Sequence, residues 1–258
     1  KRVFGFGVLM LGEQSQSIIP QSANVHLTDS PTHHIHIRST TMPRLREVSR
    51  KQADPSVLPV YDALFGDRDP VEEPGTATGT PGNWWTVFAL VPDCFAHAVA
   101  GFQFYRNKNR KINAKLRELG QSRAGYSRGS QFVFSQHCKS LRAVGFSEEQ
   151  ISAIPYWQST DLFSTIERAV LSYTDDLVLS GGRVPDGTFK VLKEHLSDEE
   201  ILELTYITCS YDMHATMCRA LHLEYDEVEE RVKEIAAPED DLQKMDFMGA
   251  IDKDKKSS

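Results

Sequence analysis

The chain has 258 residues, of which 40% are hydrophobic and 25% are charged, and its net charge is −7. This acidic balance offers no basic surface that could neutralise phosphates, so we expect no nucleic-acid partner. No run approaches about 18 apolar residues, which argues against a membrane-spanning helix. Four cysteines in a chain of this length do not make a disulfide framework. We therefore expect a globular cytoplasmic protein.

The first 41 residues differ in composition from the rest of the chain. They hold only five charged residues and are rich in Ser, Thr, Gln and His. The apolar run over residues 3–11 resembles the start of a secretory signal, but two glycines interrupt it and no Ala-x-Ala site follows. We expect residues 1–42 to lie outside the fold, as a non-native or a disordered N-terminal extension. In the first of these interpretations, Met42 is the natural start and residues 1–41 are an upstream extension. A working signal peptide is the third interpretation.

Three histidines, His33, His34 and His36, lie close together in this extension. A His-rich tract can bind a metal ion, but no Cys, Asp or Glu stands at ligand spacing around these residues. We therefore predict no metal site. At the other end of the chain, residues 237–258 are dense in charge and are predicted to form a solvated tail.

Between these ends the hydrophobic pattern is helical almost throughout. Ser147 with Gln150, and Ser197 with Glu200, have the spacing of capping boxes and mark helix starts. No run alternates as a strand would, so the predicted fold class is all-α, a single helical bundle over residues 43–236. In chain order the predicted elements are helices over residues 55–65, a Pro- and Gly-rich loop over 66–82, and helices over 84–105, 111–122, 130–144, 164–179, 186–195, 197–221 and 225–235.

Two segments carry the residues best suited to chemistry, residues 115–119 and residues 130–138. On a helix, residues 130, 133, 137 and 141 share one face, so His137 lies on a mostly apolar stripe. Such a histidine by itself is more often a satisfied core residue than a catalyst. Glu118 by itself is typical of a solvated helix face. Neither residue alone establishes a site.

Together, the two segments resemble the carboxymuconolactone decarboxylase and alkylhydroperoxidase D-like superfamily. In its peroxidase branch, a Glu is followed after eleven residues by Cys-x-x-Cys, and a His follows after three more. Placing His137 on that His puts Glu118 on the Glu, and Ser130 and Val133 on the cysteines. Ser and Val can neither attack a peroxide nor resolve a sulfenate, so a dithiol peroxidase is disfavoured.

The decarboxylase branch of the superfamily reads approximately Arg-Glu-Leu-x-x-x-Arg and then Gln-Tyr-Glu-Trp-x-x-His. This chain is similar over residues 117–119 with Arg123, and again over residues 131–137. Val133 stands where the family has its motif Glu, and phenylalanines replace the Tyr and the Trp. Weaker similarities continue in the same order on both sides, so the resemblance covers residues 43–236.

The resemblance implies roles for the residues that remain. Burial raises the pKa of a carboxyl group and lowers that of a histidine, so both can exchange protons with a substrate near neutral pH. We predict that His137 donates the proton, while Glu118 sets its tautomer or relays the proton. Arg123 would bind a substrate carboxylate or enolate, or else form a salt bridge with Glu118. Gln131 would orient the substrate or cap a neighbouring helix.

The predicted function is that of a cofactor-independent carboxymuconolactone decarboxylase-like lyase or isomerase. It would act by proton transfer on a small carboxylate, lactone or enolisable substrate. Phe134 is predicted to contact that substrate, and the Phe-rich motif favours a ligand that is larger and more apolar than a small dicarboxylic lactone. We expect no cofactor and no membrane partner. The resemblance also implies a homo-oligomer, a trimer or a hexamer.

Two other interpretations remain open. One is a hydroperoxidase-like redox protein that uses Cys138, although this residue points about 100° away from the His137 stripe and is more typical of a small buried hydrophobe. The other is a non-catalytic helical oligomer that binds a ligand. Elsewhere in the chain, Trp84 is interpreted as core, subunit contact or pocket wall, and His214 as polar packing. The interpretation as an enzyme requires Glu118 and His137 to lie together beside a cavity.

Overall fold

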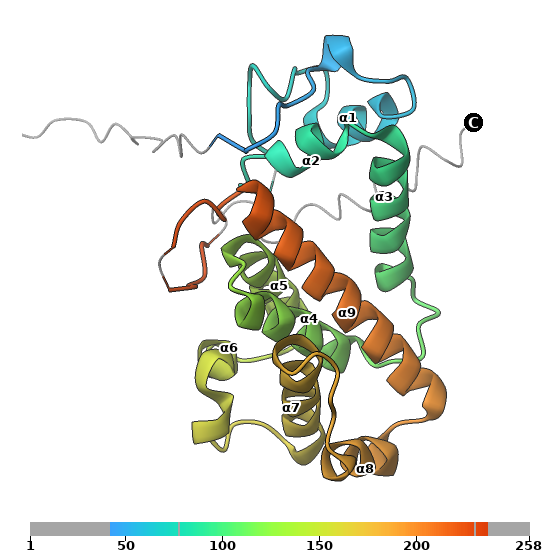
Figure 1. Ribbon diagram of the computed structural model, residues 1–258, viewed down its shortest axis with the longest axis vertical. Helices are drawn as coiled ribbons and strands as arrows, with labels where there is room; N and C mark the ends of the chain where they lie inside the picture. The colour runs from blue at the N-terminus through green and yellow to red at the C-terminus, as the bar shows by residue number, and fades with distance from the viewer. Residues whose placement is uncertain (1–41, 77, 230, 237–258) are drawn as a thin grey trace, which may run out of the picture. The chain divides into compact units, whose positions relative to one another are not determined.

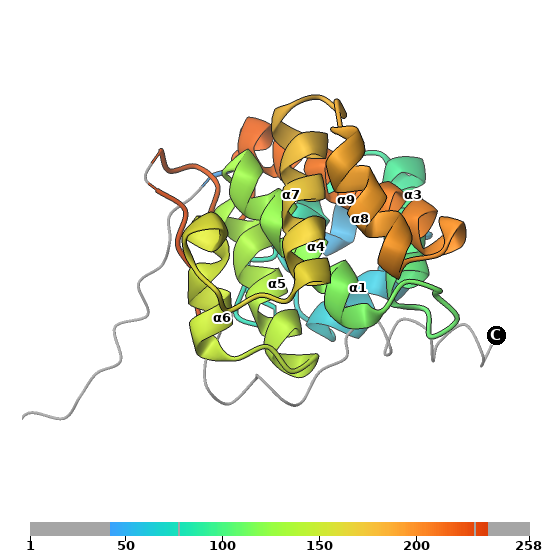
Figure 2. The same cartoon turned by 90° about the horizontal axis from the view of Figure 1, so that it is seen from below.

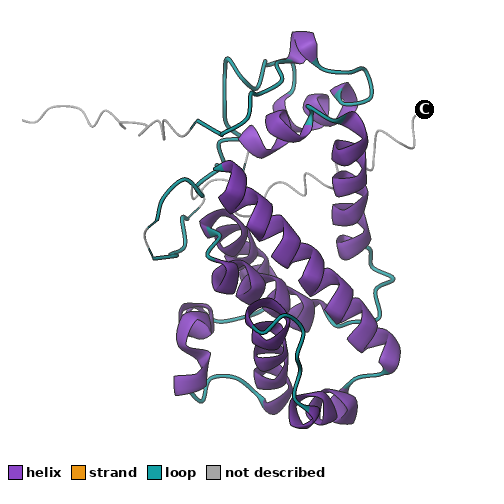
Figure 3. Ribbon diagram, viewed as in Figure 1, coloured by secondary structure: helices purple, strands orange, loops and turns teal. Residues whose placement is uncertain are grey.

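Every regular element that the structure describes is a helix, which confirms the all-α class (Figure 3). The chain divides into two units, Lys1–Arg38 and Ser39–Ser258. The computed structural model describes residues 42–76, 78–229 and 231–236, all within the second unit. Residues 1–41, which include the three neighbouring histidines, and the predicted tail over residues 237–258 lie outside the described residues.

The described part of the chain contains nine α-helices and two short 3-10 helices. Among these helices, none combines the length and the apolar character that crossing a membrane requires. In chain order they are η1 (Arg50–Gln52), α1 (Leu58–Phe65), α2 (Asn83–Phe88), α3 (Pro92–Arg106), α4 (Ala114–Arg128), α5 (Gln131–Ala143), α6 (Glu148–Ala153), η2 (Ile154–Ser159), α7 (Thr165–Leu179), α8 (Asp186–His195) and α9 (Asp198–Leu221).

Helix α4 is the central helix of this arrangement, because it packs against α5, α7 and α9. Figure 1 shows α9 running diagonally past α4 and α5, with α7 and α8 near one end of it and α1 and α2 near the other. In Figure 2, seen from below, α7 lies beside α8 and α5 beside α6, in agreement with their contacts. The central position of α4 means that any residue on its buried face lies between other helices.

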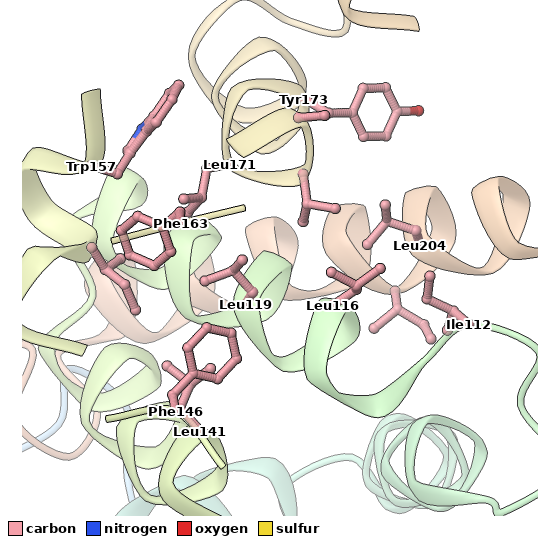
Figure 4. Close-up of a cluster of buried hydrophobic side chains, with 14 of the residues drawn as sticks. Ile112, Leu116, Leu119, Leu141, Phe146, Trp157, Phe163, Leu171, Tyr173 and Leu204 are labelled. Carbon is pink, nitrogen blue, oxygen red and sulfur yellow. The ribbon is translucent and has the colours of Figure 1, made fainter. Parts of the chain in front are cut away.

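Two apolar clusters form the core. The first surrounds α4, and Figure 4 shows Leu116 and Leu119 of this helix among side chains of α5, α7 and α9. The second joins α1, α2 and α3 to the rest of the bundle through Val133 of α5 and Ala215 of α9. Tyr211 packs against both clusters. This residue therefore marks the place where the two clusters meet.

The predicted helix over residues 84–105 is interrupted. It forms α2 and α3, which are separated at Val91, a residue with extended backbone (φ −130°, ψ 94°), and Pro92 begins the second helix. Proline has no amide hydrogen to donate to the preceding turn and disfavours a helical conformation in the residue before it. The two capping boxes predicted at Ser147 and Ser197 are confirmed at the starts of α6 and α9.

The predicted helix over residues 225–235 is wrong. Within the described residues this segment contains turns and irregular backbone, and it passes along α5. The Asp226 carboxylate accepts a hydrogen bond from the backbone amide of Gln131 at the start of α5, at 2.5 Å. The amide of Ile235 donates to the Ser135 hydroxyl at 2.9 Å, not to a carbonyl of its own turn. Tertiary partners thus replace the hydrogen bonds of a helix.

The α4–α5 pair is a tight helical hairpin. Gly129 ends α4 in the left-handed conformation (φ 81°), and Ser130 caps α5 by accepting from the amide of Val133. Within α4, a Cβ atom added at Gly125 would lie 2.7 Å from Cγ1 of Val133 and 2.9 Å from the amide nitrogen of Phe134. Only glycine lets the two helices approach this closely.

We expect Gly125→Ala to destabilise the fold. Alanine favours a helix over glycine by about 0.5–1 kcal/mol, but the overpacking against Val133 costs about 1–3 kcal/mol and outweighs that gain. Urea unfolding measures the difference. Gly187→Ala in α8 is the matched control, because nothing lies within 4 Å of the added Cβ there. A Gly125→Ala protein as stable as the Gly187→Ala protein would contradict the close approach.

Candidate functional site

Glu118 of α4 and His137 of α5 face each other across the hairpin. Nδ1 of His137 lies 2.8 Å from Oε2 of Glu118. Both residues are buried, with exposed fractions of 6% and 7%. Ser130, Val133, His137 and Leu141 are all buried, as expected for residues that share one face of α5. The structure therefore brings together the two residues that the sequence singles out for proton transfer.

Arg117 holds the other oxygen of the Glu118 carboxylate. Its Nε and Nη2 donate to Oε1 of Glu118 at 3.2 and 2.7 Å, and its Nη1 donates to the carbonyl of Tyr105 at 2.7 Å. Burial by itself would raise the pKa of Glu118, but the hydrogen bond from His137 and the charges of His137 and Arg117 outweigh it. The pKa of Glu118 consequently lies below its usual value, and the side chain is a carboxylate at neutral pH.

An ionised carboxylate only accepts hydrogen bonds, so Nδ1 of His137 must be the donor to Glu118. Whenever the imidazole is neutral, its lone pair therefore lies on Nε2. This nitrogen can take a proton as a general base, and the resulting imidazolium can return it as a general acid. Glu118 fixes the tautomer and the ring orientation, and Arg117 in turn orients Glu118.

A cavity of about 340 Å³ opens beside this pair. Its volume lies at the lower end of the range for small-molecule pockets, about 300–1,000 Å³. The wall comes from α1 to α5, from α9 and from the loop before α2. The lining residues are Leu64, Thr76, Thr78, Thr80, Trp84, Trp85, Phe102, Tyr105, Arg106, Arg117, Glu118, Gln121, Phe132, Val133, Gln136, His137, Ser140, Ala143, Val144, Tyr211 and His214.

Helix α9 contributes two ring side chains to the cavity, Tyr211 and His214, three residues apart on one face. The Tyr211 ring meets the His137 ring edge to face, with centroids 4.5 Å apart and an interplanar angle of 87°. Burial, together with the negative charge of Glu118, raises the pKa of Tyr211 well above its usual value. Its hydroxyl therefore stays protonated and remains a hydrogen-bond donor.

His214 lies against Trp84, with ring centroids 5.3 Å apart and an interplanar angle of 27°. Burial, with a smaller effect from the charge of His137, lowers the pKa of His214 to about 3. His214 is therefore a neutral aromatic ring in the cavity wall. Nothing in the sequence links His214 to the cavity, and so no site residue was predicted on α9.

We expect His214→Phe to make the protein less sensitive to acid. Between about pH 6.5 and pH 3 the unfolded chain binds a proton at His214 that the folded protein does not bind. The wild-type free energy of unfolding therefore falls with falling pH, at up to about 1.4 kcal/mol per pH unit from this residue. Phenylalanine retains the contact with Trp84 but removes this titration.

Urea unfolding at about pH 7 and about pH 4.5 measures this difference. His195→Phe is the control, because His195 is exposed on α8 and this variant should keep the acid sensitivity of the wild type. Equal acid sensitivity of the His214→Phe and wild-type proteins would show that His214 is protonated in the fold.

Arg123 does not line the cavity, so the geometry gives no support to the prediction that it binds the substrate. Its Nε and Nη2 donate to the two carboxylate oxygens of Asp175 at 2.7 and 2.9 Å, and its Nη1 donates to the carbonyl of Ile154 at 2.9 Å. The alternative prediction, a salt bridge between Arg123 and Glu118, is wrong, because Arg117 and His137 occupy that carboxylate. Arg123 instead ties α4 to α7 and η2.

Gln131 and Phe134 also lie outside the cavity. The side-chain oxygen of Gln131 accepts from the amide of Lys233 at 3.5 Å, so this residue holds the segment after α9. Phe134 is 4% exposed in the first core cluster, and its ring meets Tyr126 at 5.5 Å. The geometry therefore gives no support to their predicted substrate contacts. Phe132, on the same helix, does line the cavity.

The described thiols give no support to redox chemistry at this cavity. Cys138 is fully buried and is not among the lining residues. Burial, with a contribution from Glu234, raises the pKa of its thiol, whereas a reactive cysteine needs a stabilised thiolate. No cluster of His, Cys, Asp or Glu in the described residues could hold a metal ion.

Residues 94–176 match the model of the carboxymuconolactone decarboxylase family, and this range includes both Glu118 and His137. A relative in *Bacillus subtilis* strain 168, the uncharacterized protein YdfG, is 30% identical over 101 residues, which are 39% of this chain and 69% of that protein. The chain belongs to the carboxymuconolactone decarboxylase family. This result agrees with the resemblance seen in the sequence, and Trp84, Tyr211 and His214 lie outside the matched range.

Solved structures show the same fold as this family member. The debrominase Bmp8 has a TM-score of 0.54 at 16% identity, over 82% of this chain and 98% of that one. The AhpD core of a peroxidase-related protein from *Ralstonia eutropha* JMP134 has a TM-score of 0.53 at 15% identity, over 69% of this chain and 93% of that one. These likenesses confirm the AhpD-like fold.

Proposed function

We propose that this protein is a lyase or isomerase that acts by proton transfer on a carboxylate, lactone or other enolisable substrate. The observation that carries the proposal is the buried Glu118–His137 pair at the wall of a cavity, 2.8 Å apart. A pair of this kind fits general acid–base catalysis, which contributes about 10²–10⁴-fold to a rate. The chemistry needs no cofactor, since every step is the movement of a proton or the loss of carbon dioxide.

In the decarboxylation of a β-keto or vinylogous acid, the bond to the carboxylate carbon breaks and its electron pair forms an enolate. The imidazolium of His137 then delivers a proton to the enolate carbon through Nε2. In an isomerisation, neutral His137 first removes a proton from the carbon next to the carbonyl and returns it to another carbon. In both cases Glu118 stabilises the imidazolium.

The enolate oxygen needs a hydrogen-bond donor in the cavity. Arg123, which was predicted for this role, is bound to Asp175 instead. Tyr211 replaces it in the proposal, because its ring contacts His137 and burial keeps its hydroxyl protonated. Arg106, an exposed residue that also lines the cavity, would attract a substrate carboxylate to the entrance.

The test is turnover of β-keto acids that carry a single carboxylate, with carboxymuconolactone for comparison, by the wild type and by His137→Ala. Nuclear magnetic resonance in deuterated water follows both substrate loss and deuterium incorporation. We expect the wild type to act and His137→Ala to lose at least about 100-fold in rate. Equal rates would remove His137 from the mechanism. No turnover and no exchange with any of these substrates would overturn the proposed function.

No observation in the described residues favours the redox alternative, and the burial of Cys138 argues against it. Thiol titration with peroxide on the wild type and on Cys138→Ser would detect such an activity. The homo-oligomer, a trimer or a hexamer, stays a prediction of the family resemblance.

A further inference from the structure

We infer that the substrate bound in this cavity is a planar aromatic compound that carries a hydroxyl or carbonyl group and at most one negative charge. The inference rests on the proposed function for the reacting end of the site, and it names the class of molecule that the rest of the cavity accepts. Three independent features of the wall carry it: its aromatic side chains, its charge balance and its unpartnered polar atoms.

The aromatic side chains are gathered on one part of the wall. Trp84 stacks on Phe88 with centroids 3.9 Å apart, and it lies 5.2 Å from Phe102 and 5.3 Å from His214. Trp84, Phe102 and His214 line the cavity, whereas Phe88 does not. Phe88 therefore supports the Trp84 ring without contacting the ligand. Flat aromatic walls favour a flat ligand, because ring pairs gain energy beyond the area that they bury. Since His214 is neutral, this part of the wall has no cation.

The charges in the wall nearly cancel. The Arg117 guanidinium lies against the Glu118 carboxylate, and each is already satisfied by hydrogen bonds. A charge transferred into such a site needs an opposite charge to compensate for lost hydration. A dicarboxylate would need two cations, and the exposed Arg106 at the cavity edge is the one other Lys or Arg side chain in the described wall. A neutral or singly charged molecule fits this balance.

Three buried polar atoms of the wall have no hydrogen-bond partner within the described residues: Oε1 of Gln121, Nε1 of Trp84 and Nε2 of Gln136. Gln121 itself is only 1% exposed and follows Glu118 by three residues, on the same face of α4. Buried polar groups without partners are rare in proteins. All three residues line the cavity, so a polar group of a bound ligand can satisfy these atoms once the side chains turn toward it. Gln121 lies one helical turn from Glu118.

The size of the cavity agrees with a ring compound. An apolar cavity of about 150 Å³ is enough to hold benzene, so a cavity of about 340 Å³ has room for a bicyclic ring or a substituted single ring. The probe we choose is 2-naphthol, which is planar, uncharged and carries one hydroxyl group. Naphthalene lacks the hydroxyl group, and adipate is a flexible, non-aromatic dicarboxylate.

Isothermal titration calorimetry on the full chain tests the inference. We expect 2-naphthol to bind at least about tenfold more tightly than adipate, a difference that corresponds to about 1.4 kcal/mol. Gln121→Leu should weaken 2-naphthol about tenfold, leave naphthalene unchanged and not lower the melting temperature, since Gln121 has no partner to lose. Gln158→Leu, a matched change at an exposed residue outside the cavity, should leave all three affinities unchanged.

Adipate binding as tightly as 2-naphthol, or unchanged 2-naphthol affinity in Gln121→Leu, would overturn the inference. A lower melting temperature of Gln121→Leu would also overturn it, because Gln121 would then have a structural role. The binding experiment does not depend on turnover, because the inactive variant His137→Ala should still bind 2-naphthol. Preferred binding of 2-naphthol without turnover of any substrate would reject the proposed function but not the aromatic ligand. Turnover that depends on His137, together with preferred binding of adipate, would reject the aromatic ligand but not the proposed function.

Discussion

We expect Glu118→Gln to lower kcat by about 10²–10⁴-fold, the range over which general acid–base catalysis acts. Glutamine is nearly the same shape as glutamate, but its amide can donate to Nδ1 of His137, which then becomes an acceptor. The hydrogen of the neutral ring would move to Nε2, the nitrogen that must take the proton from the substrate. The variant also loses the negative charge that stabilises the imidazolium, at a distance of 2.8 Å in the wild type.

Steady-state kinetics on a substrate identified by the turnover test measures this effect, and circular dichroism confirms the fold. Glu148→Gln provides the matched control, because Glu148 lies in an exposed ion pair with Arg142 on the surface and this change should leave kcat within about twofold. If Glu118→Gln keeps the wild-type kcat, Glu118 has only a structural role and the proposed mechanism is wrong.

We expect Arg123→Leu to destabilise the fold by about 3–5 kcal/mol, the cost of removing one partner of a buried ion pair. The side chains of Arg123 and Asp175 are 7% and 16% exposed. The change leaves the Asp175 carboxylate with Ser127 and Trp157 as its remaining close partners and leaves the carbonyl of Ile154 without its guanidinium donor. It should leave KM and kcat close to those of the wild type at temperatures where the variant is folded.

The double variant Arg123→Leu with Asp175→Leu should recover part of this loss, because it no longer buries an unpaired charge. Urea unfolding of the two single variants and the double variant gives the coupling energy of the pair. The opposite result would be unchanged stability with KM raised tenfold or more, which corresponds to a loss of about 1.4 kcal/mol of binding free energy. That result would support the predicted role of Arg123 in substrate binding.

Most of the helices could be predicted from the sequence, because their signals are local. The capping boxes at Ser147 and Ser197 and the apolar periodicity of α7, α8 and α9 need no information from the rest of the chain. The break at Pro92 has a local signal too, but the strong apolar run around it masked that signal. The segment around Asp226 could not be predicted, because its hydrogen bonds go to α5 and not to its own turns.

The site was predicted in part. Helical spacing could have excluded Arg123, since five residues rotate its side chain by about 140° from Glu118. It could have included Gln121, which shares the face of Glu118. Phe134 is different, because it lies near the face of His137 on α5 and only the position of the neighbouring helices decides that it packs in the core. Tyr211 and His214 had no signal that linked them to Glu118 and His137, which lie more than seventy positions earlier in the chain.

The sequence by itself determined the all-α class, most helix positions and, through the family resemblance, the pairing of Glu118 with His137. These properties depend on local periodicity and on a short motif that spans one hairpin. Only the tertiary structure decided that Arg117 and not Arg123 holds the Glu118 carboxylate, and that Trp84 and His214 form the cavity wall. The reason is physical: a cavity is defined by side chains from helices far apart in the chain, and their approach depends on packing across the whole bundle.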